Sequence, residues 1–208
     1  GWFWLFLGSF EIGKEEPMRE AYQIPAGCPF GVKGLKTFRG HDGGGYEVTV
    51  TMHGKPVLVA VDDGWGGGLQ YHPVQKAPAR TEAESKKRYE AMREAQAALG
   101  AYANSLPNHP ASELFPEGMP MDAELLIEEL VNMLEAKNLR EKNAKRFAKS
   151  CAAGVLFRLK GDDKGSWRVL KTADLTRAKA QMERNYGDRV EVILNEILPG
   201  NPYAWEDF

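Results

Sequence analysis

Two short segments of the sequence combine carboxylates, an imidazole and several glycines. Residues 40–45 read Gly-His-Asp-Gly-Gly-Gly, and residues 62–68 read Asp-Asp-Gly-Trp-Gly-Gly-Gly. Such a set could bind a divalent cation, or it could press its unshielded backbone amides against a partner. The same residue types are also ordinary in hairpin turns, because a positive φ costs glycine nothing. Turn geometry alone, a contact surface and a metal or catalytic centre therefore all stay open. We call the candidate residues the rim: His41, Asp42, Asp62, Asp63 and Trp65.

Basic residues form a second candidate surface. Residues 137–189 carry 15 Lys and Arg against 6 Asp and Glu, although the whole chain has a net charge of −2. Four of these cations are spaced at i, i+3, i+4 and i+7, so one helix would present them on one side. We call this set the basic stripe: Lys142, Lys145, Arg146 and Lys149. We expect further cations on two neighbouring strands: Arg158, Lys160, Arg168 and Lys171. The pattern suits nucleic-acid phosphates or an acidic protein surface, with a merely solvated face as the alternative.

Sequence patterns typical of enzyme active sites are absent. There is no Gly-x-Ser-x-Gly, no His-Glu-x-x-His and no Cys-x-x-Cys. The two cysteines, Cys28 and Cys151, form no disulfide framework and are typical of a reduced, cytosolic protein. We therefore expect a protein that acts by binding, without catalytic residues, metal or cofactor. A metal-dependent enzyme built on the rim is the alternative.

The first part of the chain predicts a β-meander. Its candidate strands are residues 35–39, 46–53, 56–61 and 69–74. Alternating apolar and polar residues over 46–53 indicate a half-buried strand, and the apolar run 56–61 indicates a central strand covered on both faces. The first and third connections of a meander emerge at the same end, so the two glycine-rich loops should lie roughly 10 Å apart.

Two longer helices are expected in the middle of the chain. Thr81 with Glu84 forms a capping box that opens a helix to about Ser105. Its buried positions are predicted to be Tyr89, Met92, Leu99, Ala103 and Leu106. Four prolines exclude a regular element over 107–120. Asp122 then caps a second helix that runs to about Cys151, with or without a break near Lys137 and Asn138.

The last part of the chain predicts a hairpin and short helices. Strands over 155–160 and 166–171 flank a turn rich in Gly and Asp, and a helix over 174–186 ends at Gly187. Residues 190–197 have helical spacing, although their first valines also suit a strand. The order of elements predicts an α+β fold. It consists of an antiparallel β-meander with glycine-rich loops, two longer helices, a C-terminal β-hairpin and short terminal helices.

The 208 residues are enough to bury a core without disulfides or a structural metal. We divide them into an apolar extension (1–17), a glycine-rich β region (18–76), a helical region (77–152) and a hairpin, helices and tail (153–208), together one compact unit. The apolar run Trp2–Leu7 falls far short of the roughly 20 residues of a membrane helix. It also lacks the basic flank of a signal peptide, so we expect its aromatic residues to dock on the rest of the chain.

Two stretches taken together suggest a family. One is Phe38–Tyr46, followed by Gly54–Lys55 and Asp62–Gly67; the other is Val155–Lys160 with its hairpin. The combination, over about residues 20–198, resembles small proteins carried by bacteriophages and other mobile elements, some of which act as anti-CRISPR inhibitors. The resemblance implies no catalytic residues.

The resemblance implies a cytoplasmic protein of the bacterial host cell that inhibits a host defence nucleoprotein of the Cas9 type by binding it. Its basic stripe would contact DNA, RNA or the effector, and its rim would make a second contact. A DNA- or RNA-binding accessory protein with no inhibitory role is the alternative.

Overall fold

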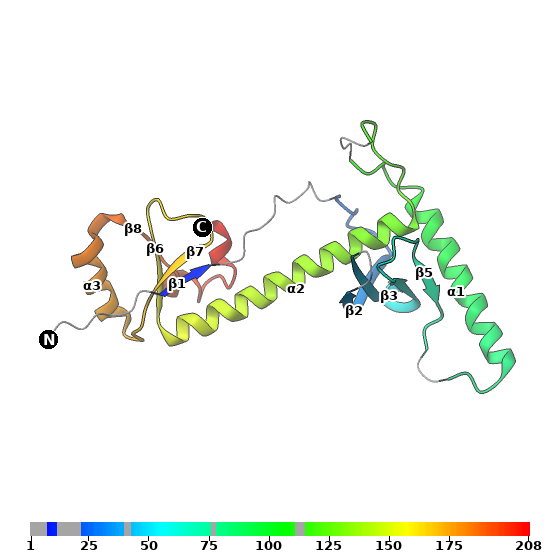
Figure 1. The fold of residues 1–208 in the computed structure, drawn as a ribbon, viewed down its shortest axis with the longest axis horizontal. Coiled ribbons are helices and arrows are strands. Elements are labelled where there is room, and N and C mark those ends of the chain that lie inside the picture. Colours follow the sequence, from blue (N-terminus) through cyan, green and yellow to red (C-terminus); the bar gives the residue numbers. More distant parts are fainter. Residues whose placement is uncertain (1–7, 12–21, 40–42, 76–77, 111–114) are drawn as a thin grey trace. The chain divides into compact units, whose positions relative to one another are not determined.

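The computed structural model describes residues 8–11, 22–39, 43–75, 78–110 and 115–208. Its contacts divide the chain into two compact units (Figure 1): a meander unit, Arg19–Ala136, and a C-terminal unit formed by Gly1–Met18 and Lys137–Phe208. Helix α2 (Ala123–Ala153) belongs to both units and is continuous, so the sequence signal near Lys137 does not interrupt it. The division between the units nevertheless falls at that position.

The meander unit contains the predicted antiparallel sheet. Its strands, in spatial order, are β2 (Phe30–Arg39), β3 (Gly44–Met52), β4 (Lys55–Asp62) and β5 (Gln70–His72). Strand β2 begins five residues earlier than predicted. Its register with β3 shifts between Lys33 and Lys36, where Gly34 takes a φ of 68°. Such a bulge bends the edge of the sheet without ending the pairing.

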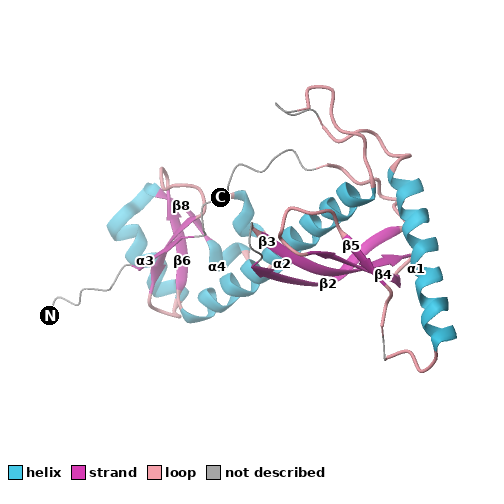
Figure 2. Ribbon diagram, turned by 45° about the vertical axis from the view of Figure 1, so that its right-hand side comes forward, coloured by secondary structure: helices cyan, strands magenta, loops and turns pink. Residues whose placement is uncertain are grey.

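Two helices cover one face of this sheet. Helix α1 (Glu82–Ala103) and the first part of α2 lie along the sheet (Figure 2). Their buried residues form one core with the inward side chains of β3 and β4. Leu58 and Ala60 of β4 are fully buried, whereas Val57 and Val59 on the other face are only half-buried. The prediction of a strand covered on both faces is therefore wrong for β4, because the helices lie on one side only.

The helix starts follow the sequence signals. The Thr81 hydroxyl accepts a hydrogen bond from the Glu84 amide (3.1 Å), and an Asp122 carboxylate oxygen accepts one from the Leu125 amide (2.9 Å). The prediction of a buried Tyr89 is wrong, since its side chain is 47% exposed. The buried residues of α1 begin at Met92, so the first turns of the helix lie beyond the core.

The C-terminal unit is built on a second antiparallel sheet. Its strands, in spatial order, are β1 (Gly8–Glu11), β7 (Ser166–Leu170), β6 (Val155–Leu159) and β8 (Val190–Ile193). The β6–β7 hairpin confirms the prediction. The N-terminal extension adds the strand β1, with Gly8 opposite Val169, while Trp2–Leu7 lie outside the described residues. The prediction of a helix over 190–197 is wrong for its first half, because β8 pairs with β6 and only α4 (Leu194–Ile197) is helical.

Both faces of this second sheet carry a core. On one face, α3 (Leu175–Tyr186), capped by Asp174, packs Ala178 and Met182 against the hairpin. On the other, the end of α2, α4 and the 3₁₀-helix η2 (Ala204–Asp207) enclose Phe147. The Phe147 ring lies 5.9 Å from the Trp167 ring and 5.2 Å from the Trp205 ring, between centroids. No helix in the described ranges is long and apolar enough to cross a membrane.

The position of Phe147 gives a test of this core. We expect Phe147→Ala to lower the free energy of unfolding by about 3–5 kcal/mol, because it leaves a cavity between two indole rings. Urea denaturation followed by far-UV circular dichroism measures the change. Leu139→Ala, on an exposed position of the same helix, should stay within about 0.5 kcal/mol of the wild type. Equal losses in the two variants would contradict this account of the core.

Candidate functional site

The described part of the rim lies in the loop that follows β4. One Asp62 carboxylate oxygen accepts a hydrogen bond from the Gly64 amide (2.8 Å). One Asp63 carboxylate oxygen accepts a hydrogen bond from the Trp65 amide (3.0 Å). The second Asp63 oxygen accepts a hydrogen bond from the Gln70 side chain (3.0 Å). These carboxylates therefore hold the loop in shape. The rim residues His41 and Asp42, in the loop after β2, lie outside the described residues.

The rim exposes an indole rather than a cluster of ligands. The Trp65 side chain is 62% exposed. Among the residues whose positions are described, no group of three or more His, Cys, Asp and Glu side chains could hold a metal ion. With Asp62 and Asp63 engaged in their own loop, the described part of the rim is better suited to contact than to cation binding.

Two tyrosines beside the rim were not singled out by the sequence. Tyr46 lies opposite Asp62 and Tyr71 opposite Ala60, so both occupy the face of the sheet that the helices cover. The pKa of Tyr46 is raised mainly by burial and, to a smaller extent, by the nearby Asp62 carboxylate. Burial and then Glu124 raise the pKa of Tyr71 to about 12. Both phenols therefore stay neutral at physiological pH and can act only as hydrogen-bonding groups.

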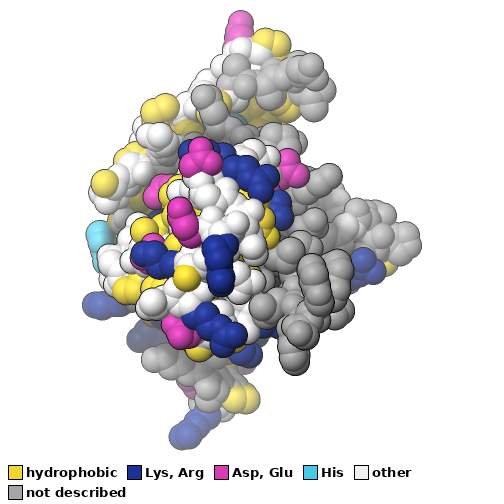
Figure 3. Space-filling model, turned by 90° about the vertical axis from the view of Figure 1, so that its left-hand side faces the viewer, with side chains coloured by type: hydrophobic (Ala, Val, Ile, Leu, Met, Phe, Trp, Pro, Cys, Tyr) yellow, Lys and Arg dark blue, Asp and Glu magenta, His cyan; other side chains and the backbone are white. Residues whose placement is uncertain are grey.

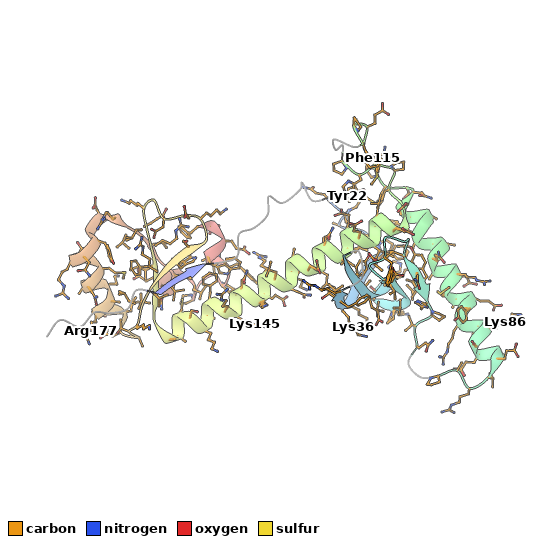
Figure 4. All side chains as sticks on the ribbon, viewed as in Figure 1. Tyr22, Lys36, Lys86, Phe115, Lys145 and Arg177 are labelled. Carbon is orange, nitrogen blue, oxygen red and sulfur yellow. The ribbon has the colours of Figure 1, made fainter. Side chains whose placement is uncertain are left out.

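The basic stripe is exposed on the part of α2 that belongs to the C-terminal unit. All four of its side chains face solvent, and Phe147 on the opposite side of the helix is fully buried. Figure 4 labels Lys145 on this helix. Glu141 is the only acidic residue between 137 and 161, and its carboxylate lies 4.0 Å from the ammonium of Lys137. No Asp or Glu stands in the sequence between Lys142 and Lys149, the first and last residues of the stripe.

Arg158 was predicted to lie with the other hairpin cations on an exposed surface. That prediction is wrong, because Arg158 is only 6% exposed. Strand β6 is covered on both faces, so an arginine on it has to be buried. Its Nη1 donates a hydrogen bond to the backbone oxygen of Phe208, and Nη2 donates one to that of Asp162 (2.8 Å). Its Nε lies 3.5 Å from a carboxylate oxygen of Glu191. Arg158 therefore holds the unit together instead of facing a ligand.

Arg168 is also engaged within the unit. Its Nε and Nη2 donate hydrogen bonds to the two carboxylate oxygens of Asp162, at 2.9 and 2.6 Å. The Arg168 hydrogen bond, followed by the one from the Leu159 amide, lowers the pKa of Asp162 to about 2, against the opposing effect of burial. Of the four hairpin cations, Lys160 and Lys171 are exposed.

Carboxylates of the last segment neutralise further cations. Glu206 accepts hydrogen bonds from Arg140 at 2.6 and 2.7 Å, and Glu196 accepts one from Lys179 at 2.8 Å. On the face drawn in Figure 3, Lys and Arg side chains accordingly lie among Asp and Glu side chains. The sequence held a signal for this: residues 190–208 contain four carboxylates and no Lys or Arg.

A groove of about 400 Å³ lies beside the stripe in the C-terminal unit. Its lining residues are Ala144, Ala148, Cys151, Ala152, Asn195, Leu198, Pro199 and Pro202. The Asn195 side chain is engaged: it accepts from the Leu156 amide (2.8 Å) and donates to the carbonyls of Cys151 and Gly154 (both 2.9 Å). Burial raises the pKa of the Cys151 thiol to about 11. The groove is therefore an apolar surface with an uncharged thiol in it.

No protein-family model matches this chain, and no match to it is found among curated proteins or solved structures. The resemblance to phage proteins therefore stays a prediction, and function has to be argued from the stripe, the rim and the groove.

The Asp162–Arg168 pair predicts a pH dependence of stability. A carboxyl whose pKa is lower in the folded than in the unfolded protein stabilises the fold above its unfolded pKa, near 3.8, and loses that effect as the pH falls through about 2. We expect Asp162→Asn to lower the free energy of unfolding at pH 6 and to differ much less from the wild type near pH 2. Urea titrations across this range measure the difference. Asp163→Asn, on an exposed neighbour, is the control, and a gap for Asp162→Asn that does not change with pH would contradict the assignment.

Proposed function

We propose that this protein acts by binding nucleic acid through its basic stripe. The observation that carries the proposal is the set of three exposed lysines, Lys142, Lys145 and Lys149, on one side of α2 with no acidic residue between them. Surface cations spaced in this way attract the phosphates of a nucleic-acid backbone and displace the counterions bound to it.

The dimensions of the stripe support contact with a single strand's backbone. From Lys142 to Lys149 the helix rises roughly 10 Å, at 1.5 Å per residue. Phosphates along one strand of B-form DNA are about 3.4 Å apart along the axis, so the stripe can contact about three of them, one for each lysine. A lysine ammonium donates to phosphate as a point charge and reads no base, so the binding is independent of sequence.

The resemblance to phage proteins supports a more specific role. We propose that the protein inhibits a host defence nucleoprotein of the Cas9 type, with the stripe on its nucleic acid or on an acidic surface of the effector. The exposed Trp65 of the rim supports a second contact, since aromatic side chains are enriched where proteins meet. An accessory DNA- or RNA-binding protein without inhibitory activity uses the same stripe.

Salt dependence tests the stripe directly. For Lys142, Lys145 and Lys149→Ala, we expect the slope of log affinity against log salt to become shallower by about 2–3, because each lost phosphate contact contributes roughly 0.7–0.9. Fluorescence anisotropy with labelled DNA, at several salt concentrations, measures it. The matched control removes three exposed cations of α1, Lys86, Lys87 and Arg93→Ala, and should keep the wild-type slope. Equal slopes in all three proteins would contradict the proposal.

The inhibitory role has its own test. We expect the wild-type protein to block DNA cleavage by a Cas9-type effector, and Lys142, Lys145 and Lys149→Glu to abolish the block while the protein stays folded by circular dichroism. Charge reversal both removes the attraction and repels phosphate, so its effect exceeds that of alanine. The α1 charge-reversal variant of Lys86, Lys87 and Arg93 should inhibit as the wild type does. Full inhibition by the folded stripe variant would refute this mechanism, and no inhibition by the wild type would leave the accessory-protein role.

A further inference from the structure

The groove and the basic stripe share one helix. Residues three or four positions apart on a helix have Cβ atoms about 5–6 Å from one another. Ala148 of the groove is thus a neighbour of Lys145, and Ala152 is a neighbour of Lys149. The small alanine side chains leave the groove open along α2, while Leu198, Pro199 and Pro202 form its opposite wall.

We infer that the groove receives an unstacked base of a single nucleic-acid strand whose phosphates lie on the basic stripe. The inference rests on the proposed function, since the stripe must first hold the backbone. It follows from charge complementarity: a strand bound along the lysines has its bases within one nucleotide of an apolar surface on the same helix. The volume of about 400 Å³ lies in the range of pockets that hold small organic molecules.

The chemistry of the groove makes this binding single-stranded. A base in a duplex is stacked and paired, so it can enter a protein pocket only if the duplex opens, whereas a single strand presents its bases at little cost. Apolar side chains can bury the two faces of such a base and leave its polar edge toward water. The stripe alone has no reason to prefer a single strand over a duplex, and the groove supplies one.

The groove binds bases without distinguishing them. Asn195 is the one lining residue with a polar amide, and all of that amide's partners lie within the unit. The remaining lining side chains are alanines, prolines, a leucine and a thiol. With no uncommitted amide, hydroxyl or charge among them, the lining can recognise the apolar faces that all bases share but not their hydrogen-bonding edges.

A strand without bases distinguishes binding of bases in the groove from binding of phosphates on the stripe. We would compare, by fluorescence anisotropy at one low salt concentration, labelled oligothymidine of about 12 nucleotides with an abasic deoxyribose-phosphate strand of equal length, and with a duplex. Wild-type protein should bind oligothymidine about fivefold to tenfold more tightly than the abasic strand. Ala148→Leu fills the groove without changing charge and with only a small change in helix propensity, so it should lower the affinity for oligothymidine to that of the abasic strand. Ala180→Leu, on an exposed position of α3, is the matched control and should change neither affinity.

Alkylation of Cys151 gives a second readout. Oligothymidine should slow the reaction of iodoacetamide with Cys151 and the abasic strand should not, with Cys28 of the meander unit as the internal reference in the mass spectrum. The double variant Trp2→Ser and Trp4→Ser tests whether the chain's own apolar segment fills the groove. If Cys151 reacts with iodoacetamide in this variant but not in the wild type, that segment occupies the groove and the inference is overturned.

The other outcomes are distinguishable. Equal affinity for the oligothymidine and abasic strands, both weakened by the stripe substitutions, would overturn the inference but leave phosphate binding intact. The groove would then be assigned to an apolar side chain of a protein partner. Absence of binding to any of the three nucleic acids would contradict the proposed function itself, and the inference with it.

Discussion

Burial of the Arg158 guanidinium constrains the whole C-terminal unit. A charge removed from water is costly unless it is paired and hydrogen-bonded. Here the partners come from three separate segments: the turn at Asp162, strand β8 with Glu191, and the backbone of Phe208. Strand β8 and the last segment must therefore both pack onto the hairpin before the charge has these partners. The same closure brings Trp205 against Phe147, so polar and apolar terms of the fold depend on one arrangement of the chain.

That closure also determines which cations remain for a ligand. As the segment after residue 189 packs onto the unit, its carboxylates reach Arg140 and Lys179, while Asp162 pairs with Arg168. Part of the excess of positive charge counted along the sequence is thus paired inside the unit. The lysines of the stripe keep their exposure because they lie on the side of α2 opposite Phe147. A count of charges could find the basic region, but only the fold shows which part of it faces solvent.

The sequence predicted elements whose signals are local. Thr81, Asp122 and Asp174 start helices through bonds to amides three residues on, and those spacings can be read directly. Predictions failed where a distant segment decides the outcome. Residues 190–193 suit helix and strand equally, and they form a strand because they pair with β6. In the same way, β1 forms because it pairs with β7.

The candidate site divides in the same way. The stripe needs only helix periodicity, so its exposure could be predicted. In the sequence, Arg158 reads as a residue on the solvent-facing side of a hairpin, but in the fold that side is covered by the end of α2 and the last segment. The run Val155–Leu159, apolar at its other four positions, was a signal that the strand is buried on both faces. The groove could not be foreseen, because its walls come from α2 and from residues 195–202, which the fold alone brings together.

Arginine and lysine have different roles in this unit, and the difference bears on specificity. Arg140 and Arg168 each donate two hydrogen bonds to one carboxylate, a bidentate arrangement that the planar guanidinium favours. Three of the four stripe residues are lysines, whose ammonium groups are compact and strongly hydrated charges. Ammonium groups follow a phosphate backbone without fixing its geometry, so the stripe can supply affinity but not selectivity. In the proposed binding mode, a preference for one form of nucleic acid has to come from shape, and we assign it to the apolar groove on the same helix.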